Sequence, residues 1–176
     1  PHREILRRAR ALPADLILLG GSTGDAEDSV YKKSMPGSTL QRVLKAAQCP
    51  VMIVNRPAAS FWGDISNIVF GTDFSRASDK AFAYAVRLAR ARNCELHLFH
   101  ALDISSMLLG KTVTQDEIEQ QRREAFRRLR GKYLSELQGV KDYSMEVWEG
   151  IPFIEIVKYA RENHGDLIVM AHHSRN

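Results

Sequence analysis

Helix-like and strand-like patterns of apolar residues alternate along this chain. Apolar side chains recur every three or four residues in some segments, whereas others are short continuous apolar runs. We expect helices at residues 3–12, 40–47, 76–92, 115–137 and from 152 onward, and strands at residues 15–20, 50–55, 67–71, 95–100, 143–148 and 166–170. Short apolar strands that alternate with helices are typical of an α/β fold with a mainly parallel sheet. In such a sheet the carboxyl ends of the strands share one edge, where ligands bind.

Two helices carry further local signals. Ser75 stands where an N-cap would begin the helix at residues 76–92, and Ser38 or Thr39 could do the same for the helix at 40–47. The helix at 115–137 is the longest expected. It places one apolar stripe toward the core, formed by Ile118, Phe126, Leu129, Tyr133 and Leu137.

An internal repeat decides the domain organisation. Residues 1–19 align without a gap to residues 152–170, and eight of the 19 positions are identical. A repeat of this kind indicates two copies of a domain-sized unit. We expect residues 1–56 to be the C-terminal part of a first copy, 57–64 a linker, and 65–176 a second copy that lacks its last helix and strand.

Several segments together resemble the universal stress protein family, whose members are often tandem duplications. Residues 68–75 are similar to the family's opening strand and turn, 15–21 and 166–171 to its fourth strand, and 37–54 to its closing loop, helix and fifth strand. The resemblance implies a Rossmann-like, doubly wound, mainly parallel five-stranded sheet of the adenine nucleotide alpha hydrolase type, in tandem copies. It also implies a homodimer, or an intramolecular pseudo-dimer of the two copies.

Composition and charge exclude several classes of protein. The chain has 176 residues, 44% hydrophobic and 26% charged, with a net charge of +4, which fits an ordinary globular protein. We expect no membrane partner, because no uncharged apolar run approaches the roughly 20 residues that span a bilayer. Cys49 and Cys94 lack metal-site spacing and fit a reducing compartment, so we expect a cytoplasmic protein.

A glycine-rich segment in the first copy is a candidate phosphate site. It comprises Gly21, Gly24, Gly37, Ser38 and Thr39. Glycines allow close backbone approach to a phosphate, and helix N-terminal N–H groups can bind it. ATP-binding members of the family have nine residues between the second and third glycines, whereas this chain has twelve, including three carboxylates. The alternative interpretation is a surface loop with turn glycines.

The second copy presents a candidate adenine site. The resemblance implies that Asp73, which directly follows a strand, accepts a hydrogen bond from the adenine amino group. Thr72 precedes it, and Ala101, Met170 and Ala171 stand at other strand ends. Ala171 occupies a position where the family usually has glycine. The alternative role for Asp73 is a carboxylate stabilised at the start of a helix.

The sequence therefore favours a cytoplasmic stress-response protein that binds ATP, with or without Mg²⁺, and acts by binding or dimerisation. The alternatives are a scaffold of the same fold that binds no nucleotide, and a slow ATPase. No catalytic or metal-binding arrangement is recognisable. The arginine-rich helix at 115–137 also carries acidic residues, so we expect ion pairs along it to neutralise much of its charge. Aromatic residues that could stack on bases are not interleaved with the arginines. For both reasons we do not expect nucleic-acid binding.

Overall fold

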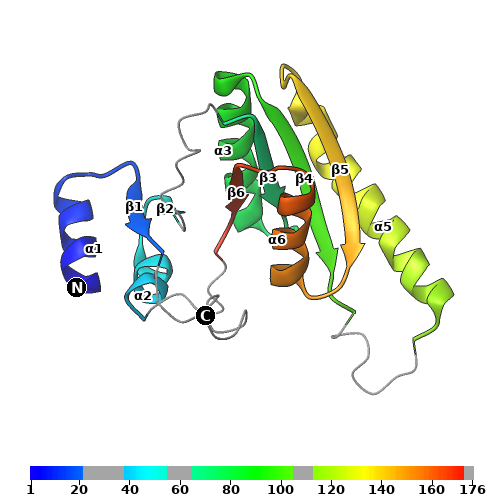
Figure 1. Ribbon diagram of the computed structural model, residues 1–176, viewed down its shortest axis with the longest axis horizontal. Helices are drawn as coiled ribbons and strands as arrows, with labels where there is room; N and C mark the ends of the chain where they lie inside the picture. Colours follow the sequence, from blue (N-terminus) through cyan, green and yellow to red (C-terminus); the bar gives the residue numbers. More distant parts are fainter. Residues whose placement is uncertain (22–37, 55–64, 105–112, 173–176) are drawn as a thin grey trace. The chain divides into compact units, whose positions relative to one another are not determined.

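The computed structural model describes residues 1–21, 38–54, 65–104 and 113–172. Contacts within the chain divide it near residues 63 and 64 into two compact units, and each unit is described by itself. The expected linker at residues 57–64 and most of the expected loop before residue 37 lie outside the described residues. Figure 1 labels the helices and strands of both units.

In the first unit the described residues form two helices and two strands: α1 (His2–Ala11), β1 (Ile17–Gly20), α2 (Ser38–Ala46) and β2 (Val51–Val54). β1 and β2 form a parallel two-stranded sheet in which Ile17 lies opposite Val51. Leu6 of α1, Ile17 of β1 and Val43 of α2 form the buried core of this unit. Each element therefore contributes its apolar face, as the helical and strand-like patterns predict.

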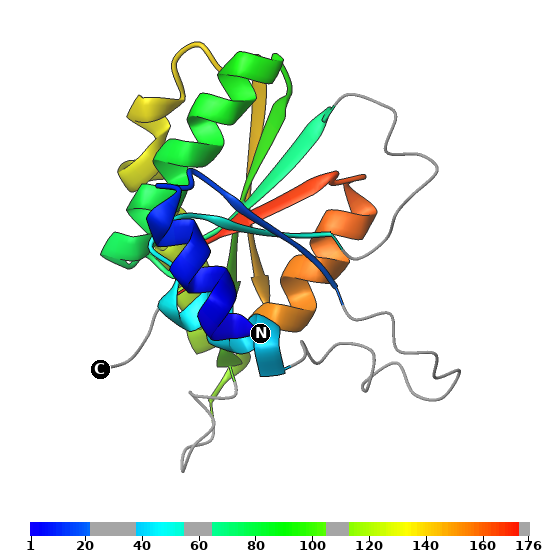
Figure 2. The same cartoon turned by 90° about the vertical axis from the view of Figure 1, so that its left-hand side faces the viewer.

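The described residues of the second unit form four strands and three long helices: β3 (Asn67–Gly71), α3 (Arg76–Arg92), β4 (Glu95–Leu102), α5 (Gln115–Tyr133), β5 (Asp142–Glu149), α6 (Pro152–Glu162) and β6 (Leu167–Met170). A 3₁₀ turn at Leu134–Leu137 follows α5. The strands form one parallel sheet in the order β5-β4-β3-β6. α3 and α5 cover one face of this sheet and α6 covers the other (Figure 2).

Alternating residues of the central strands supply both cores of the second unit. Ile68 and Phe70 of β3 pack toward α3 and α5, whereas Val69 between them packs toward α6. All three side chains are fully buried. A parallel strand buried on both faces reads as a continuous apolar run, which is why the sequence revealed β3 but not which residue faces which helix.

The two sheets differ from the expected five-stranded sheet. Among the described residues the structure has a two-stranded sheet in the first unit and a four-stranded sheet in the second. The α/β architecture with parallel strands is confirmed, and the five-stranded form of it is not seen.

The two segments that repeat in sequence adopt the same local structure. Residues 2–11 and 152–162 are helices, and residues 17–20 and 167–170 are strands. The aspartate that both segments share has a clear role in the second unit. Oδ2 of Asp166 accepts hydrogen bonds from the backbone N–H groups of Ser66 (2.8 Å) and Asn67 (3.0 Å). These bonds join the start of β6 to the start of β3.

One expectation about the core of α5 is wrong. Leu129, Tyr133 and Leu137 are buried, but Phe126 is 39% exposed. An α-helix turns by about 100° per residue, so position 126 lies only about 20° from position 133 in projection, and its exposure follows from its place along the helix rather than around it. The predicted stripe is therefore buried only from Leu129 onward.

Candidate functional site at the carboxyl edge of the sheet

The four-stranded sheet reverses its direction of winding between β3 and β6. The chain leaves β3 through α3 on one face and reaches β6 from α6 on the other (Figure 2). Ligands of open parallel sheets bind outside the carboxyl ends of strands at such a switch point. Gly71 lies opposite Met170 in the register of β3 and β6. The predicted residues Thr72, Asp73 and Ala171 therefore follow neighbouring strand ends, as the sequence predicts.

The side chain of Thr72 points into the core and makes its hydrogen bonds there. Its side chain is buried, and its hydroxyl lies 2.9 Å from the hydroxyl of Tyr133 and accepts a hydrogen bond from the N–H of Phe74 (2.9 Å). The Tyr133 hydroxyl in turn donates to Asp79 Oδ1 (3.2 Å). Burial raises the pKa of Tyr133 to about 12, so this hydroxyl keeps its proton. Thr72 shapes the edge of the sheet through these contacts.

Asp73 organises the start of α3. Its Oδ1 accepts hydrogen bonds from the backbone N–H of Ser75 (2.9 Å) and from the hydroxyl of Ser78 (2.5 Å). Ser75 is the N-cap of α3, as predicted, and its side chain accepts from the N–H of Ser78. Partial burial raises the pKa of Asp73, but the hydrogen bonds from Ser75 and Ser78 outweigh it and lower the pKa to about 2. The bonds from the Ser75 N–H and the Ser78 hydroxyl both use Oδ1.

The acid stability of the second unit should depend on Asp73. A carboxylate whose pKa is lowered on folding stabilises the protein above its unfolded pKa, near 4, and loses that contribution as the pH falls toward 2. Because Asp73 is exposed, we expect Asp73→Ala to lower the free energy of unfolding at pH 7 by only about 1 kcal/mol. Urea unfolding at pH 7, 4 and 2 should show that this difference disappears at pH 2. An equal difference at every pH would assign the effect to packing.

Phe74, the residue after Asp73, contacts an imidazole ring and a guanidinium group. Phe74 has a left-handed backbone (φ 62°), and its ring lies between the His100 ring (4.4 Å between centroids) and the guanidinium of Arg128 (4.5 Å from the ring centroid). His100 Nδ1 donates to the carbonyl oxygen of Thr72 at 2.8 Å, because a carbonyl can only accept. Burial lowers the pKa of His100 below its usual value, which favours the neutral ring.

The sequence did not predict the partners of these residues. Tyr133 lies 61 positions from Thr72, and His100 meets a backbone carbonyl that any residue could provide. Ser78 carried a usable signal, because it stands three residues after the N-cap.

The remaining predicted residues divide between the two units. Ala101 lies within β4, opposite Trp148, and packs with the core beneath α6. Met170 is 54% exposed at the end of β6. Gly21 follows β1 and donates to the carbonyl of Val54. Ser38 and Thr39 are the first two residues of α2 rather than residues ahead of it. Gly24 and Gly37 lie outside the described residues.

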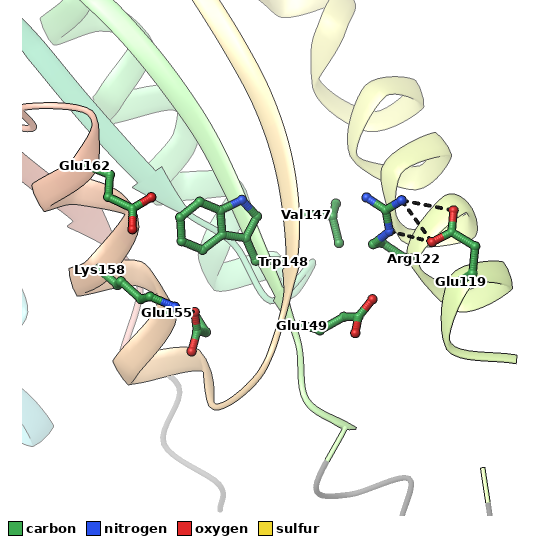
Figure 3. Close-up of a pocket in the computed structure, with 8 residues that line it drawn as sticks. All are labelled: Glu119, Arg122, Val147, Trp148, Glu149, Glu155, Lys158 and Glu162. Atoms are coloured by element: carbon green, nitrogen blue, oxygen red, sulfur yellow. Dashed lines mark hydrogen bonds and ion pairs between the residues drawn. The ribbon is translucent and has the colours of Figure 1, made fainter. Parts of the chain in front are cut away.

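A separate hollow of about 520 Å³ lies at the carboxyl end of the edge strand β5 (Figure 3). Its lining consists of Glu119, Arg122, Val147, Trp148, Glu149, Glu155, Lys158 and Glu162. The indole of Trp148 points toward α6, where the ammonium of Lys158 is 5.7 Å from the centre of its ring. Arg122 binds Glu119 on the opposite side of β5. None of the residues that the sequence singled out for nucleotide binding lines this hollow.

The charge of the hollow argues against phosphate binding there. Four carboxylates and two cations line it, and each cation already contacts one of the carboxylates. Negative charge that is not neutralised repels a polyphosphate. Glu155 stands in the first turn of α6, with its side chain only 14% exposed, and so already occupies the helix end that attracts anions. A nucleotide is better placed at the switch point.

Two features are absent from the described residues. No group of three or more histidine, cysteine, aspartate or glutamate side chains there is arranged to hold a metal ion. Within the same residues, no helix combines the length and apolar character that crossing a bilayer requires.

Comparison with known proteins agrees with this architecture. The chain is 30% identical over 108 residues to universal stress protein MJ0531 of Methanocaldococcus jannaschii, which covers 58% of this chain and 62% of that protein. The chain thus spans less than two thirds of this relative's length. Among solved structures, a universal stress protein from Archaeoglobus fulgidus matches 97% of this chain and 53% of its own, with a TM-score of 0.67 and 20% identity. A functionally unknown protein, PA1789 from Pseudomonas aeruginosa, matches 97% of this chain and 56% of its own, with a TM-score of 0.62 and 19% identity.

At these identities the two structures establish the fold and nothing more. The family assignment rests on a separate match. The model of the universal stress protein family matches residues 65–176, which include all four strands of the second unit and the switch point between β3 and β6. The chain belongs to the universal stress protein family.

Proposed function

We propose that this chain binds an adenine nucleotide such as ATP at the switch point of the second unit. The observation that carries the proposal is that Asp73 and Ala171 follow the ends of two neighbouring strands, on either side of the reversal in winding. The adenine would lie near Asp73, whose Oδ2 accepts the amino group while Oδ1 holds the start of α3. The phosphates would run past Ala171, away from the carboxylates beside Trp148.

The same geometry would support signalling by binding rather than by turnover. Hydrolysis needs a Mg²⁺ ion and a positioned water molecule. The titratable groups at the carboxyl edge of the sheet already have hydrogen-bond partners. Asp73 Oδ1 binds the start of α3, and His100 Nδ1 binds a backbone carbonyl. We therefore assign no catalytic base among the described residues, and we keep slow ATP hydrolysis as an outcome to be measured.

We also propose that residues 1–56 and 65–176 belong to two tandem copies of one domain in a cytoplasmic protein, joined by a linker at 57–64. Two observations support the tandem arrangement. The repeated segments form the same helix and strand in each unit, and the contacts divide the chain near residues 63 and 64. Each copy would complete a five-stranded sheet in the longer protein, and the copies would pair as a pseudo-dimer or with a second molecule.

Isothermal titration of the full chain with ATP and Mg²⁺ tests nucleotide binding. We expect Asp73→Ala to weaken binding about tenfold or more, because the adenine amino group would lose its hydrogen-bond acceptor. Inosine triphosphate should bind about tenfold more weakly than ATP to the parent chain and equally to Asp73→Ala, since its base has a carbonyl in place of the amino group. Asp142→Ala is the matched control, because it removes a carboxylate from the first residue of β5, at the opposite edge of the sheet.

Three results would contradict the proposal. The absence of heat at millimolar nucleotide would favour a dimerising scaffold, which light scattering would then have to show. An unchanged affinity in Asp73→Ala would move the adenine away from β3. Equal affinity for ATP and inosine triphosphate in the parent chain would exclude recognition of the amino group. Phosphate release above a control without protein would add an ATPase activity.

A further inference from the structure

The outer surfaces of α3 and α5 together carry a strong positive charge. The two helices contain eleven basic and five acidic residues, a net charge of +6, whereas the whole chain carries only +4. The exposed cations form a surface that we call the basic face: Arg76, Lys80, Arg87, Arg90, Arg123, Arg127, Arg128 and Arg130. The rest of the chain is therefore slightly acidic, and the charge is concentrated on one side of the second unit.

The helical periodicity aligns these cations in two rows. Arg76, Lys80 and Arg87 are separated by four and seven residues, so they lie on one side of α3. The buried residues of α3, including Phe82 and Ala85, lie on the opposite side of the helix, toward the sheet. With a rise of about 1.5 Å per residue, the row from Arg76 to Arg87 is about 16 Å long.

A second row lies on α5, where Arg123, Arg127 and Arg130 are separated by four and three residues, and Leu129 and Tyr133 are the buried positions. Both helices cover the same face of the sheet (Figure 2), so both rows point outward from it. Lys132 and Arg128 occupy the surface nearer α3, where they contact the backbone and ring of Phe74.

The ion pairs expected along α5 neutralise little of this charge. Within the described part of the chain, Glu119 binds Arg122 near the start of α5, and Asp79 of α3 binds Lys132 at 2.7 Å. Three of the four acidic residues of α5 lie at or before position 119, whereas its six basic residues lie at positions 122–132, where Glu124 is the remaining carboxylate. The basic face therefore attracts anions over its whole length.

The chemistry of the basic face selects one class of polyanion. Ala83 lies between Lys80 and Arg87 on this side, and among the described residues of the two helices Phe126 is the one large apolar side chain classed as exposed, which is too little apolar surface to enter a lipid bilayer. Two cationic rows, about 16 Å and about 10 Å long, match the dense, regular charge of a nucleic-acid duplex, and contacts to phosphates require no aromatic side chains. We propose that the basic face binds the sugar–phosphate backbone of double-stranded nucleic acid without reading its bases.

Fluorescence anisotropy of the full chain with a labelled 20-base-pair DNA duplex, in 50 to 200 mM KCl, tests this proposal. If about six phosphates are contacted, affinity should fall roughly 1,000-fold across this range, linearly in logarithmic coordinates. A variant with Lys80→Ala, Arg87→Ala and Arg127→Ala should reduce the slope by about one for each contact removed and bind at least about tenfold more weakly at 50 mM KCl. These three residues lie outside the proposed nucleotide site.

A matched variant with Arg10→Ala, Lys158→Ala and Arg161→Ala removes the same charge from α1 and α6. It should retain the slope of the parent chain. Equal losses in the two variants would mean that net charge alone drives binding and would overturn the proposal. So would the absence of duplex binding at 50 mM KCl. Polyglutamate or anionic phosphatidylserine vesicles that compete as well as unlabelled duplex would instead assign the face to an acidic protein or a membrane surface.

Discussion

Tyr133→Ala is expected to lower the free energy of unfolding of the second unit by about 3–5 kcal/mol, the usual cost of removing a buried aromatic ring. The ring is 1% exposed and packs against Phe82 (4.4 Å between centroids) and edge-on against Phe70 (5.6 Å). Its hydroxyl joins Thr72 at the end of β3 to Asp79 of α3. Removing the ring leaves a cavity between α5 and the sheet and removes partners from both polar groups.

Urea unfolding followed by Trp148 fluorescence, in a chain where Trp62 is replaced by Phe, reports on the second unit. Tyr133→Phe keeps the ring and should cost about 1–2 kcal/mol, because only the hydroxyl bonds are lost. Tyr143→Ala is the control, since that ring is 42% exposed, and it should cost less than about 1 kcal/mol. If Tyr133→Phe were as damaging as Tyr133→Ala, hydrogen bonding and not ring packing would dominate at this position.

Gly71→Val should destabilise the second unit by about 3 kcal/mol, at the upper end of the usual cost of overpacking. Gly71 ends β3 directly beneath α6, and a Cβ atom there would overlap Cδ1 of Ile156. Ile156 is 5% exposed and belongs to the core that joins α6 to the sheet. A larger residue would therefore push α6 away from the switch point at which we place the nucleotide.

A smaller change at the same position separates overlap from backbone effects. Gly71→Ala should cost about 1–3 kcal/mol and should cost about 1 kcal/mol less in an Ile156→Val chain, which lacks the overlapping Cδ1 atom. Gly131→Ala is the matched control. That glycine lies in α5 with no heavy atom within 4 Å of an added Cβ, so the change should stabilise the helix by up to about 1 kcal/mol. If Gly71→Ala and Gly131→Ala lowered the free energy of unfolding by the same amount, the overlap with Ile156 would be excluded as the cause.

The candidate site shows where sequence reasoning succeeds and where it stops. The strand ahead of Asp73 and the N-cap at Ser75 were predicted correctly, because both depend on residues within a few positions of each other. The alternative role of Asp73, as a carboxylate at the start of a helix, is present in the structure. Thr72 was predicted to line a ligand site, but its hydroxyl is buried against Tyr133. No local pattern could indicate that contact, because the two residues come from different elements.

The distribution of charge gives a second example of what the sequence could not predict. The sequence places acidic and basic residues on one helix, and spacing alone suggests that they neutralise each other. In the structure the acidic residues gather in the first turns of α5, Lys132 pairs with Asp79 of α3, and Arg128 covers the ring of Phe74. Whether two cationic rows form one surface depends on which helices cover the same face of the sheet. The order of the strands decides that arrangement.

The sequence by itself determined the succession of helices and strands, the repeated helix and strand, and the resemblance to the universal stress protein family. These properties follow from local periodicity and from residue identities, which a linear chain displays in full. The tertiary structure alone decided that β3 lies between β4 and β6, that Thr72 faces the core, and that the cations of α3 and α5 share one side. Each of these depends on contacts between segments far apart in the chain, and the packing of the whole sheet selects them.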